Sequence, residues 1–200
     1  MNVPASRQPT SPRPLTLLDA MILVAATASA CPVIRWIGKD FDPDESLPDL
    51  FLGLLAQGRF GAFGAVLAIL SLPFAVAWTV AVIPLQLKRP RPARRRLARQ
   101  PGWMAACSAV PGMMLLALGV GVIFLGWGRS SFYLDDLEFS LFALAPSLAG
   151  ATVLGSWMTL IVGGRWRAEA SWIDRLGRAL GVYWLAMGSG APFLARWIFH

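Results

Sequence analysis

The chain has 200 residues, of which 56% are hydrophobic and only 14% are charged, and its mean hydropathy is +0.57. This composition excludes a water-soluble globular protein, because so few polar side chains cannot cover a soluble surface. The formal charge of +7 at pH 7 would suit a nucleic-acid-binding protein, but the charges fall in short blocks between long apolar runs. That spacing is typical of membrane loops.

The first residues, 1–14, carry four prolines and lack apolar periodicity. We predict that they form a disordered cytoplasmic tail. Residues 15–200 are then expected to form a single transmembrane helical domain.

Five apolar runs follow the tail, at residues 17–37, 60–87, 103–127, 139–163 and 180–198. Each approaches the length of about 20 residues that a helix needs to cross a hydrocarbon core about 30 Å thick. The fifth run is short, rich in Gly and interrupted by Pro192, so a re-entrant or interfacial segment is the alternative there. We therefore predict an all-α integral membrane helix bundle with about five transmembrane helices.

Two amphipathic segments flank these runs. Leucines and Phe51 recur at helical spacing over residues 47–55, and apolar residues including Trp166 and Trp172 do so over residues 166–180. A helix with one apolar and one polar face lies along a membrane surface. We expect both segments to be surface helices.

Helix starts are marked by a Ser or Thr followed three residues later by an acid, the pattern of a capping box. It occurs as Thr16 with Asp19, Ser46 with Asp49 and Ser171 with Asp174, and in a looser form as Asp135 with Glu138. An acid inside a transmembrane helix would be a candidate ion or proton site. The pattern favours a capping role for Asp19 over such a site.

The loop between the second and third runs carries seven basic residues: Lys88, Arg89, Arg91, Arg94, Arg95, Arg96 and Arg99. Excess Lys and Arg stay on the cytoplasmic side of a membrane. If the runs alternate in direction, 13 of the 18 basic residues share that side. We predict a cell inner-membrane protein with a cytoplasmic N-terminus and, if the fifth run crosses, an outside C-terminus.

The same seven side chains are candidates for binding the anionic headgroups of membrane lipids, at about 1 kcal/mol per charge near the surface. Nucleic acid is not expected as a partner, because the loop lacks interleaved aromatic residues that could stack on bases.

The fourth run contains a ladder of small residues at four-residue spacing: Ala143, Ser147, Ala151 and Gly155. Small residues at this spacing let another helix approach closely. We predict a helix-packing face, within the chain or against a partner. Each run also contains a proline, which frees a carbonyl either to line a substrate path or to bond a neighbouring helix.

Catalytic, metal-binding and cofactor-binding residues are not predicted. The only histidine is His200, at the end of the sequence. Paired-histidine metal sites, and Ser-His or Cys-His catalytic pairs within the membrane, are therefore not expected. Cys31 and Cys107 fall near opposite ends of their runs, too far apart for a disulfide.

The runs PLTLLDAMILVAATA (residues 14–28) and SWIDRLGRALGVYWL (residues 171–185) resemble segments of uncharacterised bacterial multi-pass membrane proteins. The resemblance covers the first run and the entry to the fifth. It implies no activity, substrate or catalytic residue.

The sequence therefore favours a non-catalytic accessory or assembly subunit, bound to another membrane protein or to a second copy of itself. A transporter or channel component is the alternative, and a membrane-bound enzyme is the third interpretation.

Overall fold

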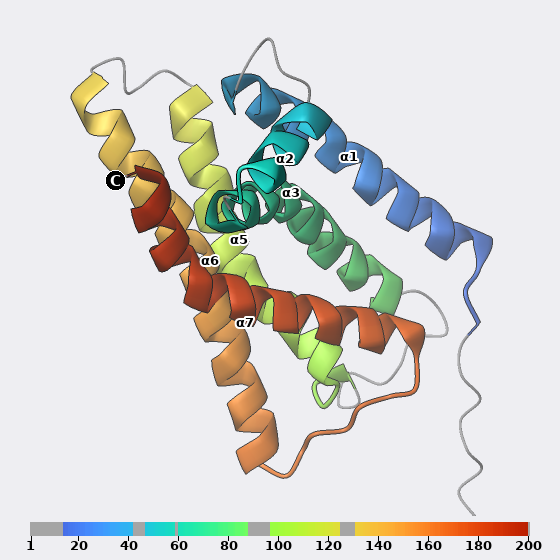
Figure 1. Ribbon diagram of the computed structural model, residues 1–200. Coiled ribbons are helices and arrows are strands. Elements are labelled where there is room, and N and C mark those ends of the chain that lie inside the picture. Colours follow the sequence, from blue (N-terminus) through green and yellow to red (C-terminus); the bar gives the residue numbers. More distant parts are fainter. Residues whose placement is uncertain (1–13, 42–46, 59, 88–96, 125–130, 200) are drawn as a thin grey trace, which may run out of the picture.

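A computed structural model describes residues 14–41, 47–58, 60–87, 97–124 and 131–199, which contain six α-helices and no strand (Figure 1). The helices are α1 (Leu17–Phe41), α2 (Leu47–Ala56), α3 (Phe60–Leu87), α5 (Pro101–Phe124), α6 (Ser131–Val162) and α7 (Trp172–Phe199). The predicted all-α fold is confirmed. The predicted tail lies outside the described residues, apart from Pro14.

Among the described residues, four helices contain segments that are long and apolar enough to cross a membrane. The segments are Leu17–Arg35, Phe63–Leu87, Pro101–Gly119 and Ala143–Val162. Helix α7 is not among them, because Asp174, Arg175 and Arg178 fall in its first turns and glycines interrupt its apolar remainder. The first four predicted runs thus correspond to four membrane-length helices, and the fifth corresponds to a longer and more polar one.

Two helix boundaries differ from the sequence prediction. Helix α6 begins at Ser131, so Asp135 and Glu138 lie inside it and the looser cap predicted there is wrong. Residues 131–145 contain neither Pro nor Gly, and nothing interrupts helical bonding before Pro146. Helix α7 joins the predicted amphipathic segment to the fifth run, because the glycines at 177 and 181 weaken a helix without ending it.

The helices form a bundle in which α5 and α6 lie side by side and α7 crosses them obliquely (Figure 1). Helix α7 also packs against α3, while α1 lies on the outside against α3, and the short α2 contacts α3. Helices α1, α5 and α7 begin, and α3 and α6 finish, toward the same side of the bundle. We call this side the capped end, because buried carboxylates bond helix starts there.

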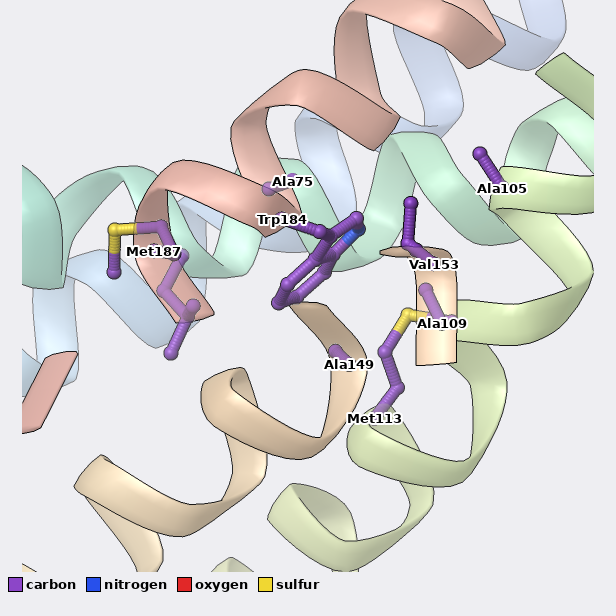
Figure 2. Packing of buried hydrophobic residues seen from close by; sticks show 9 residues of the cluster. Ala75, Ala105, Ala109, Met113, Ala149, Val153, Trp184 and Met187 are labelled. Carbon is purple, nitrogen blue, oxygen red and sulfur yellow. The ribbon is translucent and has the colours of Figure 1, made fainter. Parts of the chain in front are cut away.

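The main core lies where α3, α5, α6 and α7 meet (Figure 2). Its buried members are Leu72, Ala75, Ala105, Ala109, Met113, Ala149, Val153, Trp184 and Met187. The Trp184 ring is 2% exposed and fills the space that the surrounding alanines leave. Its Nε1 donates to Thr79 Oγ1 at 3.0 Å, and Thr79 donates to the Ala75 carbonyl at 2.6 Å. One large side chain of α7 therefore joins three other helices.

Candidate functional site

Glycines set the crossings of α7 with its neighbours. A Cβ atom at Gly150 of α6 would lie 2.7 Å from the Trp184 carbonyl oxygen and 2.9 Å from the Cα of Gly188. A Cβ at Gly177 would lie 2.6 Å from the Gly102 carbonyl oxygen of α5. Real Cβ atoms do not tolerate such distances, so only glycine allows these backbones to meet. These glycines were not among the predicted packing residues.

The crossing of α6 and α7 also contains a hydrogen bond that a proline makes possible. Pro192 has no amide hydrogen, so it cannot bond the carbonyl of Gly188 four residues earlier. The Ser147 hydroxyl of α6 shares its hydrogen between that carbonyl, at 3.1 Å, and the Ala143 carbonyl of its own helix, at 2.7 Å. The freed carbonyl of Gly188 therefore accepts a hydrogen bond from a neighbouring helix, and it is not left to line a substrate path.

The predicted ladder on α6 divides between inside and outside. Ala143 and Ser147 are half-buried, whereas Ala151 and Gly155 are exposed. A Cβ at Gly155 would have no atom within 4 Å outside its own helix. Inside the chain, close approach is made by Gly150, one position away from the ladder. The ladder as a face for a partner stays a prediction.

An exposed line of residues at spacings of three and four runs along α6. We call it the outer stripe, and its members are Leu144, Leu148, Ala151, Gly155, Met158 and Val162. Alternate spacings of three and four keep residues on one helix face. Two small residues, Ala151 and Gly155, thus lie between larger apolar ones in the middle of the stripe.

Two buried carboxylates define the capped end. Thr16 N donates to Asp19 Oδ2 at 3.0 Å, and Asp19 N donates to Thr16 Oγ1 at 3.3 Å, which is a reciprocal capping box. This prediction is confirmed. Asp19 is fully buried, although it lies in the first turn of α1.

Asp174 caps a helix other than its own. Its Oδ1 accepts a hydrogen bond from Gly102 N in the first turn of α5, at 3.0 Å. Its Oδ2 accepts one from Glu169 N at 3.1 Å and lies 3.3 Å from Arg178 Nε. The Asp174 carboxylate therefore connects α5, α7 and the segment before α7, which is a wider role than the local box predicted with Ser171.

Burial dominates the electrostatics of Asp174, whose residue surface is 1% exposed. Desolvation raises the pKa of its carboxyl above the ordinary value of 3.8, against the opposing effects of Gly102 N–H, Arg178 and Glu169 N–H. Loss of water disfavours the charged form more than these partners favour it.

Basic residues surround the capped end. Lys88, Arg89, Arg91, Arg94, Arg95 and Arg96 lie outside the described residues. Arg99 is exposed, and its carbonyl accepts a hydrogen bond from Arg167 N at 3.0 Å. Arg165 and Trp166 are also exposed. Arg165 and Arg167 belong to the basic residues predicted on the cytoplasmic side, but they were not among the predicted lipid-binding residues.

Within the described ranges, no group of three or more His, Cys, Asp or Glu residues could hold a metal ion. Cys31 and Cys107 are both free. Among the described residues, four apolar helices of membrane-crossing length, packed through glycines and buried hydroxyls, fit a multi-pass helical membrane protein. No family model, curated protein or solved structure matches the chain.

Proposed function

We propose that this protein is a non-catalytic accessory or assembly subunit, and that a helix of its partner docks on the outer stripe of α6. The observation that carries the proposal is the open space at Gly155. Gly150, five residues earlier on the same helix, is in backbone contact with α7. Gly155 has the same capacity for close approach, and none of the residues that the structure describes lies within 4 Å of a Cβ placed there.

The physical reason lies in how helices associate in lipid. Acyl chains are as apolar as leucine, so burying apolar surface gives no driving force between helices in a membrane. Association instead needs the close packing that small residues allow. The exposed small residues Ala151 and Gly155, bordered by Leu148 and Met158, supply a surface of this kind.

The alternative functions receive less support. A transporter would use freed carbonyls and polar groups along a path, but Ser147 already bonds the Gly188 carbonyl. An enzyme at the membrane face would need available acids, whereas Asp19 and Asp174 bond helix starts.

Site-specific photo-crosslinking in native membranes tests the proposal. A benzophenone amino acid at Leu148, on the outer stripe, should crosslink to a membrane protein, either another polypeptide or a second copy. The same group at Val80, an exposed position of α3, should crosslink to lipid only. Gly155→Leu should abolish the protein crosslink at Leu148 without reducing the amount of inserted protein.

Two results contradict the proposal. One is lipid crosslinking alone from both positions. The other is a protein crosslink at Leu148 that persists unchanged in Gly155→Leu, since a partner helix packed on Gly155 would collide with the added side chain.

We further propose that the protein lies in the cell inner membrane with the capped end in the cytoplasm, the N-terminus inside and the C-terminus outside. The basic residues Arg99, Arg165, Arg167 and Arg175 are exposed at that end, in keeping with the positive-inside rule. Cytoplasm-active and periplasm-active reporters, fused to each terminus in turn, test this orientation. An outside N-terminus contradicts it, and two inside termini would mean that α7 does not cross.

A further inference from the structure

The segment that joins α6 to α7 is fixed at its start by a helix C-cap. Gly164 has a φ of +59°, Arg165 N donates to the Leu160 carbonyl at 2.9 Å, and Gly164 N donates to the Ile161 carbonyl at 3.0 Å. This pair of hydrogen bonds around a left-handed glycine is the Schellman motif. Arg165 therefore leaves the helix in a defined direction, three residues after Val162.

Two further contacts hold the segment against α5. Arg167 N donates to the Arg99 carbonyl at 3.0 Å, which connects the segment to the residues just before α5. The Trp166 ring meets Trp157 edge to face, with centroids 5.6 Å apart. Trp157 in turn donates through Nε1 to the Pro101 carbonyl at 3.0 Å. The side chains of Arg99, Arg165, Trp166 and Arg167 therefore lie on an ordered backbone, and we call these four residues the arginine platform.

The platform is positively charged, and the buried acids near it do not neutralise its arginines. Its three arginines are exposed, and Arg175 adds a fourth exposed cation nearby in sequence. The acids Asp19 and Asp174 are 0% and 1% exposed and bond backbone amides. Glu169 is half-buried and already has an interaction of its own. An anion at this surface would meet arginines with few competing carboxylates.

The depth of the platform indicates which anion it suits. The membrane-length segment of α6 ends at Val162, which is 81% exposed, and Arg165 follows three residues later. Tryptophan concentrates at the level of lipid headgroups, and Trp166 lies between the two arginines. Guanidinium groups bind phosphate through paired hydrogen bonds.

We propose that the arginine platform binds the phosphate of an anionic phospholipid. This site is independent of the outer stripe of α6, so either proposal can fail without the other. It also differs from general attraction to a charged membrane, because it assigns binding to particular arginines whose backbone is held by the Trp166–Trp157 contact and the Arg167–Arg99 bond.

Native mass spectrometry of the full chain in an uncharged detergent tests the site. Phosphatidylglycerol and phosphatidylcholine are titrated separately, and bound lipid is counted. We expect phosphatidylglycerol to bind more tightly, and the double variant Arg165→Gln/Arg167→Gln to weaken it about 30-fold, given about 1 kcal/mol for each of the two charges removed. The variant keeps the main-chain bond to Arg99, so its melting temperature without lipid should equal that of the parent.

Arg35→Gln is the matched control, because Arg35 is an exposed arginine toward the opposite end of α1. It should leave phosphatidylglycerol binding within twofold of the parent. The proposal is overturned if the double variant binds as the parent does or if Arg35→Gln is equally impaired. Competition by inorganic phosphate at the lipid's own concentration would also overturn it, since the site would then accept a soluble anion.

Discussion

The Ser147 hydroxyl donates to the Gly188 carbonyl oxygen at 3.1 Å, across the crossing of α6 and α7. The acceptor is available because Pro192 has no amide hydrogen to bond it. In Figure 1, α7 changes direction in its C-terminal half, where Pro192 lies. A serine on one helix thus compensates for a proline on another, and the pairing gives a first prediction.

Ser147→Ala should lower the free energy of unfolding by about 0.6 kcal/mol, and by no more than about 1.7 kcal/mol, the range for hydrogen bonds between membrane helices. In a Pro192→Ala background the cost should fall, because the restored amide bonds Gly188 within α7. A double-mutant cycle measured by denaturation in mixed micelles gives the coupling. Ser189→Ala is the control, since that hydroxyl is exposed and bonds its own helix. Equal costs in both backgrounds would disprove the compensation.

A matched pair of glycine substitutions tests the helix crossing. Gly150→Ala should destabilise the bundle by about 1–3 kcal/mol, because its Cβ would collide with the α7 backbone. Gly155→Ala should be neutral or stabilise by up to about 1 kcal/mol, since alanine is the better helix former and its Cβ meets nothing. Unfolding free energies of both variants decide the matter. A larger loss of stability in Gly155→Ala than in Gly150→Ala would contradict the crossing of α6 and α7 at Gly150.

Trp184 should be the most sensitive large side chain of α7. Trp184→Ala should cost about 3–5 kcal/mol, because it leaves a cavity among α3, α5 and α6 and removes the hydrogen bond to Thr79. Phe193→Ala on the same helix should cost little, since Phe193 is 78% exposed. Melting temperatures in one detergent compare the two variants. A similar loss in both would contradict the assigned core.

The capped end should respond to pH through Asp174. Because its pKa is raised in the folded chain, the folded state holds the proton more tightly than the unfolded state does. The contribution of this group to stability is therefore fully present below pH 3.8, is lost as pH rises to the raised pKa, and is constant above it.

Subtracting the unfolding free energy of Asp174→Asn from that of the parent isolates the group over pH 3–7. This difference should decline as pH rises through the window and then level off. A difference that grows with pH would mean that Gly102, Glu169 and Arg178 favour the charged carboxylate more than burial opposes it.

Features encoded by neighbouring residues could be predicted from the sequence. The apolar runs predict the membrane-length helices because length and hydropathy decide insertion. The box of Thr16 and Asp19 involves residues three apart, so a local pattern is sufficient to find it. The partner of Asp174 could not be found this way, since Gly102 is 72 positions distant.

The packing residues show the same limit. A small-residue ladder is visible in the sequence, but each step along a helix rotates the side chain by about 100°. Gly150 and Ala151 therefore face different surroundings, and only the position of α7 shows that Gly150 is the inner one. Likewise, the continuity of α7 depends on its packing against three helices, which no local pattern reports.

The position of Trp184 also has a consequence for the order of biosynthesis. Ribosomes release the chain from its N-terminal side, so α3, α5 and α6 enter the bilayer before α7 exists. Until then, the alanines that surround Trp184 lack the large side chain that fills the space between them. Consolidation of the helices into a stable unit is therefore a late event that follows insertion, and a nascent chain stalled before α7 would expose this unfilled surface to quality-control proteases.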